Sequence, residues 1–244
     1  FLMIRRPPRS TPYPTLFPYT TLFRSLAKIL RIGLPAGIHI ALLALSDVLI
    51  QSTGSSFGDV FMSGNAAASN LEGFVYVCLN AFHQSAVNFV GQNAGAKQYR
   101  RVDGILVRCM ILVILIGVVL GQGAYRLGDP LLHIYSQDPE VIAYGIQRFS
   151  MVSMTYFLCG MMDVVSGALR GLGHSVMPAV ITLIGVCVLR VVWVCTVFPL
   201  HPTMGNLMLS YPITWAVTAA ANGLYLYWVC RRLSRPEYGV VKRA

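Results

Sequence analysis

One apolar run, residues 149–169, limits the fold of this chain more than any other feature, because Asp163 is its only charged residue. A helix rises about 1.5 Å per residue, so this run is long enough to cross the roughly 30 Å hydrocarbon core of a bilayer. It ends in a basic turn with Gly171 and Gly173, where glycine can adopt the positive φ that ends a helix and Arg170 can bond the last free carbonyls. We therefore predict a transmembrane helix that holds Asp163 inside the membrane, where an acid marks a candidate functional site.

Composition extends this prediction to the whole chain. Of its 244 residues, 55% are hydrophobic and 11% are charged, and the mean hydropathy is +0.62, which leaves too few charges to cover a soluble globule. The partner is therefore a lipid bilayer, and despite the net charge of +10 no nucleic-acid partner is expected. The six cysteines lie in or beside apolar runs without C-x-x-C spacing, so we expect no disulfide, no metal site and no cofactor.

The fold class that we predict is an all-α membrane protein, a six-transmembrane-helix bundle over residues 26–233. The six spans are expected at about 29–51, 66–90, 104–125, 141–169, 176–198 and 207–229. Residues 234–244 form a tail beyond the last span.

The first 25 residues do not fit this pattern. They contain five prolines, no acidic residue and no sustained periodicity, which argues against a helix or a packed core. A signal peptide is not predicted either, because no uninterrupted apolar region follows the basic residues. The stretch TLFPYTTLFRS at residues 15–25 resembles a translated sequencing-library adapter. We therefore expect residues 1–25 to be an artefactual, non-native segment.

Two of the predicted spans carry polar stripes. In the first span, His39, Asp47 and Gln51 recur at helical spacing and share roughly one face. In the second span, polar side chains repeat at every fourth position, with His83 beside them: Glu72, Tyr76, Asn80, Gln84 and Asn88. Hydrogen bonding between helices is one explanation. The number of polar groups favours the other, a water-filled cavity that these residues line.

Loop charge predicts the orientation. Beyond residue 25, nearly all lysines and arginines near the ends of the predicted spans lie in four ranges, 28–31, 91–108, 170–174 and 231–243. The loops at the opposite ends of the spans hold only Arg126. By the positive-inside rule the first group is cytoplasmic. We therefore expect a multi-pass protein of a plasma membrane of the bacterial inner-membrane type, with both ends of residues 26–244 in the cytoplasm.

Four short motifs, in order along the chain, carry a family resemblance. They are GLPAG at 33–37, GQNAGA at 91–96, DPEV at 138–141 and GALRGLGHS at 167–175. Together they resemble the C-terminal half, helices 7 to 12, of multidrug and toxic compound extrusion (MATE) transporters. The resemblance implies one lobe of a twelve-helix protein, with a missing N-terminal six-helix lobe as its partner. It also implies efflux of amphipathic or cationic small molecules in exchange for H⁺ or Na⁺ by alternating access, and no enzyme activity.

The resemblance implies acidic residues in helices 7 and 10. Asp163 lies on the equivalent of helix 10, and Asp47 is the only candidate on the equivalent of helix 7. Counting about 1.5 Å per residue along the spans puts Asp47, Glu72 and Arg190 at one depth. We therefore predict a structural charge pair between Arg190 and either Asp47 or Glu72. Asp163 is then left without a basic partner, and an unpaired buried carboxylate is suited to bind a proton or another cation.

Two other functions fit parts of the sequence. A flippase for lipid-linked precursors, of the same superfamily, would need a basic cavity for a pyrophosphate, but only Arg190 is predicted deep in the membrane. An intramembrane enzyme could use His39, His83 and Asp163, but the sequence has no H-E-x-x-H, G-x-S-x-G or paired-carboxylate spacing. Both functions rank below the transporter.

The predicted orientation is testable by cysteine labelling. Cysteines introduced at Ser56 and Thr203 in a cysteine-free chain should react with a membrane-impermeant thiol reagent in intact cells, whereas one at Gln98 should react only after the cells are opened. Labelling of Gln98→Cys in intact cells, with protection of the other two positions, would overturn the orientation.

Overall fold

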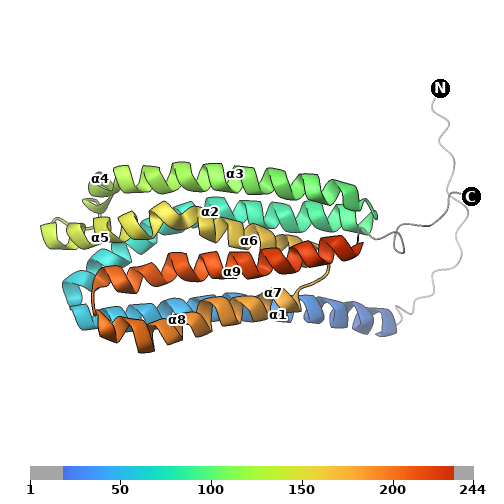
Figure 1. The fold of residues 1–244 in the computed structure, drawn as a ribbon, viewed down its shortest axis with the longest axis horizontal. Helices are drawn as coiled ribbons and strands as arrows, with labels where there is room; N and C mark the ends of the chain where they lie inside the picture. Colours follow the sequence, from blue (N-terminus) through green and yellow to red (C-terminus); the bar gives the residue numbers. More distant parts are fainter. Residues whose placement is uncertain (1–18, 234–244) are drawn as a thin grey trace, which may run out of the picture.

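The computed structural model describes residues 19–233, and the side chains of several residues within 19–43 lie outside that description. The described chain is a bundle of long helices with no strand among these residues (Figure 1). The predicted all-α bundle is therefore confirmed. Residues 1–18 of the predicted artefactual segment and the predicted tail, residues 234–244, lie outside the described part.

Six long helical segments make up the described bundle, and each contains one of the six predicted span ranges. The uninterrupted ones are α1 (Tyr19–Gly54), α2 (Asp59–Gly95), α3 (Tyr99–Arg126) and α9 (Met204–Leu233). A short helix, α4 (Gly128–Leu132), follows α3. A 3₁₀ turn joins α5 (Pro139–Met151) to α6 (Tyr156–Gly171). Finally, α7 (Val176–Thr182) and α8 (Leu189–Val192) form one rod with two π-helical turns, Leu183–Val188 and Trp193–Val197.

Helix α1 begins at Tyr19, inside the segment for which no helix was predicted, and that expectation is corrected. The last proline of the segment is Pro18. From Tyr19 up to Pro35, every residue can therefore supply the main-chain N–H that a helix needs. Nothing in this stretch stops the helix from extending beyond its apolar part.

Four segments of the described chain are both long and apolar enough to cross a membrane. They are Ile40–Phe57, Tyr99–Arg126, Pro139–Gly171 and Val176–Leu200. The six predicted spans include two more helices, α2 and α9, which are long enough but more polar. Polar side chains of α9 such as Thr214, Thr218 and Asn222 are fully buried inside the bundle. Their polarity faces protein, so it lowers the hydropathy of the helix without facing lipid.

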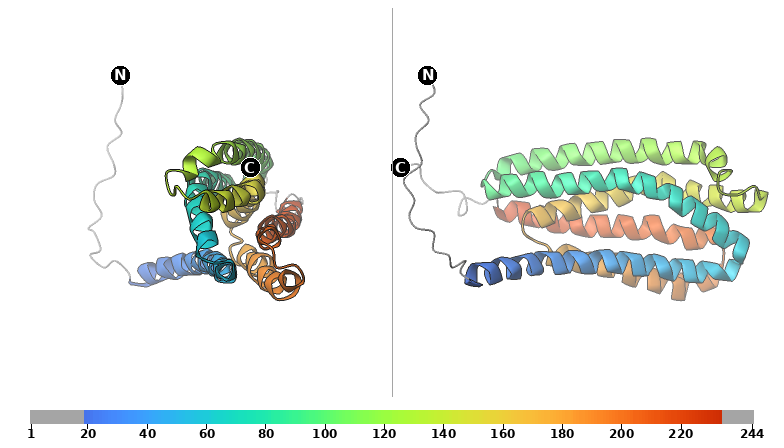
Figure 2. Two further views of the ribbon diagram at one scale, coloured as in Figure 1. Left: turned by 90° about the vertical axis from the view of Figure 1, so that its left-hand side faces the viewer. Right: turned by 180° about the vertical axis from the view of Figure 1, so that it is seen from behind.

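The helices form two layers. The larger layer consists of α2, α3, α5, α6 and α9, and its buried core includes Leu79, Val113, Val164 and Leu207. The smaller layer consists of α1 and the α7–α8 rod, which pack against each other and contact α9. Figure 1 shows α3 at one edge of the bundle and α1 with α8 at the opposite edge, and the end-on view of Figure 2 separates the two layers.

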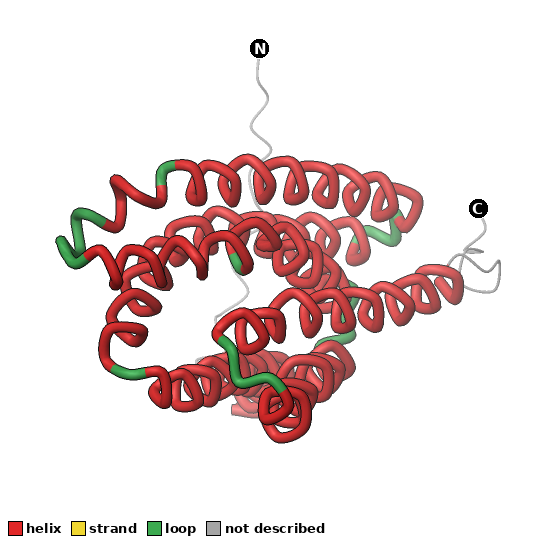
Figure 3. Tube along the Cα trace, turned by 60° about the vertical axis from the view of Figure 1, so that its left-hand side comes forward, coloured by secondary structure: helices red, strands yellow, loops and turns green. Residues whose placement is uncertain are grey.

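Short loops join the helices, so that successive long segments run in opposite directions (Figure 3). As a result, the start of α1, the loop between α2 and α3, the end of α6 and the end of α9 all lie at one end of the bundle (Figure 1). The basic loop residues belong to this end, among them Lys97, Arg101, Arg170 and Arg231. The helix directions therefore gather the basic loops on one side.

Close contacts within the larger layer depend on glycine. Gly117 and Gly121 lie about one turn apart on α3, and a β-carbon at either position would collide with main-chain atoms of Phe157 or Ser153. This small-xxx-small spacing lets membrane helices approach closely. On α6, a β-carbon at Gly171 would lie 2.8 Å from the main-chain oxygen of Val87 on α2. Main chain thus packs on main chain where α2, α3 and α6 meet.

Gly121 provides a test of this packing. Gly121→Ala would press a methyl group against the Ser153 main chain, which cannot rotate away, so the free energy of unfolding should fall by about 1–3 kcal/mol. The matched control is Gly223→Ala on α9, where nothing lies within 4 Å of the added carbon and alanine favours the helix. Thermal unfolding in detergent should show a loss for Gly121→Ala alone; equal melting temperatures for the two variants would contradict the packing described here.

Candidate functional site

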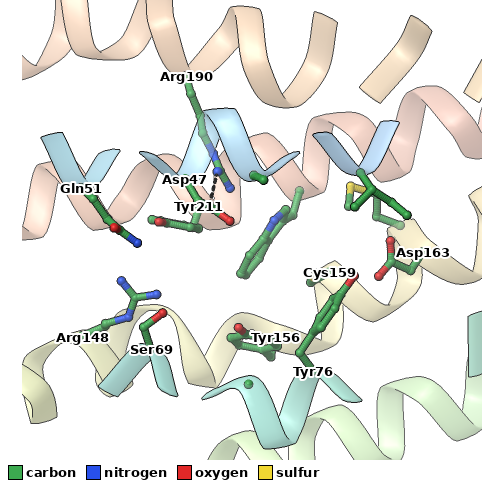
Figure 4. A pocket seen from close by; sticks show the side chains of 15 residues that line it. Asp47, Gln51, Ser69, Tyr76, Arg148, Tyr156, Cys159, Asp163, Arg190 and Tyr211 are labelled. Atoms are coloured by element: carbon green, nitrogen blue, oxygen red, sulfur yellow. Dashed lines mark hydrogen bonds and ion pairs between the residues drawn. The ribbon is translucent and has the colours of Figure 1, made fainter. Parts of the chain in front are cut away.

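A cavity of about 350 Å³ lies between the two layers of helices (Figure 4). Its charged lining residues are Asp47, Arg148, Asp163 and Arg190, and its large aromatic ones are Tyr76, Tyr156, Tyr211 and Trp215. Figure 4 shows Asp163 at one end of the cavity and Arg148 with Gln51 at the other. Six helices, α1, α2, α5, α6, α8 and α9, contribute to the wall.

Arg190 on α8 is neutralised by Asp47 on α1. Its Nη1 donates to Asp47 Oδ1 at 2.8 Å and to Ser46 Oγ at 3.1 Å, and its Nε donates to Thr214 Oγ1 at 3.4 Å. The guanidinium is almost fully buried, whereas the Asp47 side chain is half-exposed. Of the two partners predicted for Arg190, the structure therefore supplies Asp47.

Glu72 on α2 has a different partner, Arg148 on α5. Arg148 Nε and Nη2 donate to Glu72 Oε2 at 3.0 and 2.8 Å, and Arg148 Nη1 donates to Asn65 Oδ1 at 2.6 Å. The Ser153 hydroxyl donates to Glu72 Oε1 at 3.0 Å. All four side chains are buried. This network fixes α2 to the junction of α5 and α6.

Sequence reasoning missed Arg148. The expectation that Arg190 is the only basic residue deep in the membrane is corrected, because Arg148 also lines the cavity and is 5% exposed. A signal was available: Arg148 falls inside the predicted span 141–169, and a basic residue within an apolar span requires an acid on a neighbouring helix.

Tyr211 on α9 lies between the two ion pairs. The guanidinium of Arg190 is 4.2 Å and that of Arg148 is 5.5 Å from the centre of its ring. Trp215, one turn later on α9, meets Tyr211 edge-on, and its ring centre lies 5.4 Å from that of Tyr156 on α6. These three rings form an aromatic wall of the cavity.

Asp163 differs from the other charged residues of the cavity. It is buried, yet among the described residues no hydrogen bond or ion pair reaches its carboxylate. Its main-chain carbonyl accepts a hydrogen bond from Nδ1 of His83 on α2 at 2.7 Å. The His83 ring packs against Gly167, where a β-carbon would lie 3.0 Å from Nδ1. The glycine thus lets His83 approach the α6 main chain beside Asp163.

Arg170 does not bond the last carbonyls of α6, and that expectation is corrected. Gly173, with a φ of 86°, ends the helix as predicted, and the main-chain N–H groups of Gly173 and His174 donate to the carbonyls of Arg170 and Leu169. Arg170 is not needed there. Because helical side chains lean toward the N-terminus of their helix, its guanidinium reaches back instead, and Nη1 lies 3.4 Å from His83 Nε2.

The predicted polar stripe on α2 spirals around the helix. Tyr76 lines the cavity and Glu72 is buried in its ion pair, but Gln84 and Asn88 are exposed and Asn80 is half-buried, and these three do not line this cavity. A helix turns about 100° per residue, so a repeat of four rotates by about 40° at every step. Gln84 and Asn88, toward the C-terminal end of the stripe, therefore face away from Glu72 and Tyr76 at its N-terminal end.

The remaining predicted site residues whose side chains are described do not assemble a metal or acid–base cluster. Among the described side chains, no group of three His, Cys, Asp or Glu residues could hold a metal ion. His83 contacts the main chain of Asp163 and not its carboxylate. Gln51 lines the cavity, and the side chain of His39 on α1 lies outside the described part.

Long apolar helices around a central cavity with buried charges define a helical membrane protein. The family model MatE matches residues 35–196, which is most of the described chain. The protein belongs to the MatE family, and the family resemblance seen in the sequence motifs is confirmed.

Named relatives match this chain over part of their length. It is 27% identical over 177 residues to the "Probable multidrug resistance protein YpnP" of Bacillus subtilis, covering 72% of this chain and 40% of that protein. It is 24% identical over 166 residues to the "Probable multidrug resistance protein NorM" of Thermotoga maritima, covering 68% and 36%. A crystal structure of the Vibrio cholerae MATE transporter VcmN in the bent form shares the fold, with a TM-score of 0.79 at 18% identity, over 90% of this chain and 50% of that one. The chain spans less than half the length of these two curated relatives.

The two ion pairs should contribute differently to stability. Glu72→Gln leaves the Arg148 guanidinium buried without a counter-charge and should lower the free energy of unfolding by about 3–5 kcal/mol. Asp47→Asn should lower it by less, because the Asp47 carboxylate is half-exposed and Arg190 keeps its bonds to Ser46 and Thr214. Denaturant unfolding of the two purified variants measures the difference; the reverse order of stability would show that the Glu72 network is not the stronger one.

Proposed function

We propose that this chain is one lobe of a secondary active exporter, which moves amphipathic or cationic small molecules out of the cell in exchange for H⁺ or Na⁺. The observation that carries this proposal is the charge balance of the cavity. Arg148 and Arg190 are each paired with a carboxylate, whereas the Asp163 carboxylate has no partner among the described residues. The cavity is therefore left with one unneutralised negative charge, which attracts a cation.

The rest of the lining supports an organic cation as the substrate. Tyr156, Tyr211 and Trp215 offer aromatic faces and edges, and the face of an aromatic ring attracts a cation. The cavity volume, about 350 Å³, falls within the range of about 300–1,000 Å³ that is usual for small-molecule sites. A molecule with an apolar body and one positive charge would match both features.

Exchange follows from a single carboxylate with two alternative ligands. Asp163 can hold the coupling ion, H⁺ or Na⁺, or it can hold the cationic substrate. Binding of the ion then weakens binding of the substrate, and binding of the substrate weakens binding of the ion by the same free energy. Alternating access also requires one structural repeat to rock against another. We therefore propose a second six-helix lobe as the partner of this one, in a plasma membrane of the bacterial inner-membrane type. The basic loop ends, including both ends of the described bundle, would face the cytoplasm.

The cavity does not favour the flippase that the sequence left as an alternative. Recognition of a pyrophosphate would require guanidinium groups with free donors. Both arginines that line the cavity already donate to carboxylates, Arg148 to Glu72 and Arg190 to Asp47. Among the described residues, no such ion pair occupies the Asp163 carboxylate.

Asp163→Asn tests the proposal. The amide keeps the size of the side chain but removes the charge, so the dependence of export on pH or Na⁺ should disappear and the affinity for a cationic dye should fall about tenfold. The measurement is ethidium efflux by this chain together with its N-terminal half, over a range of pH and Na⁺ concentration. Asp129→Asn, which changes an exposed carboxylate on α4, is the matched control and should export like the wild type. Ion-coupled export at the wild-type rate by Asp163→Asn would refute the role of this carboxylate.

A further inference from the structure

His83 stands between Asp163 and Arg170. Its Nδ1 lies 2.7 Å from the main-chain oxygen of Asp163, and its Nε2 lies 3.4 Å from Arg170 Nη1. A carbonyl oxygen can only accept a hydrogen bond, and a guanidinium can only donate one. Both contacts are satisfied together by the neutral imidazole with its hydrogen on Nδ1 and its lone pair on Nε2. The geometry thus makes His83 an acceptor for Arg170.

Arg170 is incompletely satisfied in this position. Its Nε and Nη2 are buried and have no hydrogen-bond partner among the described residues. Its contact with His83 is long for a hydrogen bond and joins a cation to a neutral acceptor. A carboxylate would be a stronger partner, because charge-assisted hydrogen bonds to a guanidinium are shorter and often bidentate.

Asp163 is the carboxylate that lies on the same helix as Arg170, α6. The two residues are seven positions apart, which is about two helical turns, so they share one face. The Arg170 side chain reaches back along α6 to His83, which is the direction in which Asp163 lies. Between them on this face lie Gly167, which has no side chain, and Ser166, whose hydroxyl is buried without a partner. No large side chain of α6 therefore separates the two residues on this face, and the Ser166 hydroxyl is free to bond a guanidinium that moves between them.

The other groups around Asp163 cannot take this role. Tyr76 on α2 and Cys159 on α6 are neutral neighbours in the cavity lining. Across the cavity, Arg190 is held by Asp47. Both arginines among the described lining residues thus have a carboxylate partner.

We propose that Arg170 is a tethered counter-cation for Asp163. It rests on His83 while a transported cation occupies the carboxylate, and it moves onto the carboxylate as that cation leaves. This inference rests on the proposed function, because it assumes that Asp163 binds the cation. Arg170 then competes with every ligand of Asp163, so it weakens their binding and favours their release.

A double-mutant cycle on Asp163 and Arg170 tests the competition. The measurement is the dissociation constant of tetraphenylphosphonium for the purified transporter, that is, this chain with its N-terminal half. Arg170→Gln should tighten binding about tenfold when Asp163 is present, because it removes the competing charge, and should change nothing in the Asp163→Asn background. Arg170→Lys keeps the charge and should bind like the wild type. Arg126→Gln, an exposed arginine at the end of α3, is the matched control.

Variants of His83 provide a second test, in which tetraphenylphosphonium binding is expected to weaken and not to tighten. His83→Leu removes the resting partner of Arg170, so Arg170 stays on Asp163 and tetraphenylphosphonium should bind more weakly. His83→Gln, which can donate to the Asp163 carbonyl and accept from Arg170, should restore the wild-type constant. Damage to the fold would weaken binding in both Arg170→Gln and His83→Leu. If Arg170→Gln does not fold, the comparison of the two His83 variants carries the test.

The outcomes separate this inference from the proposed function. Equal dissociation constants for the wild type and Arg170→Gln, or the same tightening in both Asp163 backgrounds, would overturn the role of Arg170. Wild-type affinity in His83→Leu would overturn the role of His83 as its resting partner. If Asp163→Asn alone leaves tetraphenylphosphonium binding unchanged, the proposed function itself fails, and the inference falls with it.

Discussion

A charge within a membrane helix bundle needs a partner on another helix, and in this chain that requirement joins segments far apart in the sequence. Arg190 and Asp47 are 143 positions apart, and Arg148 and Glu72 are 76 positions apart. In each pair the guanidinium is buried, so loss of the carboxylate would leave an uncompensated charge in a medium of low dielectric. The two pairs therefore fix which helices are neighbours around the cavity. They also neutralise the cavity wall, which makes the bare carboxylate of Asp163 its distinguishing chemical feature.

The Asp163 side chain lines the cavity, and His83 holds the α6 main chain at the same residue. The aromatic wall of Tyr156, Tyr211 and Trp215 lines one side of the cavity. On the other side, His83 bonds the α6 main chain at Asp163 and holds the Arg170 guanidinium nearby. A carboxylate placed in this way is more strongly affected by a single arriving or departing charge than one at a protein surface would be. The family, the cavity and this sensitivity are the features on which the proposed transport function rests.

The helical class, the membrane location and the buried position of Asp163 could be predicted from the sequence because they depend on run length and hydropathy. Which acidic residue pairs with which arginine could not be predicted from the sequence. Counting along the helices placed Asp47, Glu72 and Arg190 at one depth, but depth says nothing about which helices are side by side, and Glu72 lies next to Arg148 instead. The prediction that the whole polar stripe on α2 lines a cavity was incorrect for a different reason. Residues spaced four apart drift around a helix with 3.6 residues per turn, so the two ends of the stripe face different surroundings. Arg170 was misjudged because a main-chain motif at Gly173 already ends the helix.

The placement of the ion pairs within the two layers has a consequence for motion. Asp47 and Arg190 both belong to the smaller layer, α1 with the α7–α8 rod, whereas Glu72 and Arg148 both belong to the larger one. The larger layer is stiffened by contacts of main chain on main chain at its glycines, while the rod contains two π-helical turns, which often mark sites of local rearrangement. A shift of one layer against the other would therefore leave each layer with its own neutral pair. It would break the hydrogen bond and ring contact of Arg190 with Thr214 and Tyr211 and strain the hydrogen bonds that join Trp193 and Val197 of the rod to Asn206 on α9, but it would separate neither pair of opposite charges.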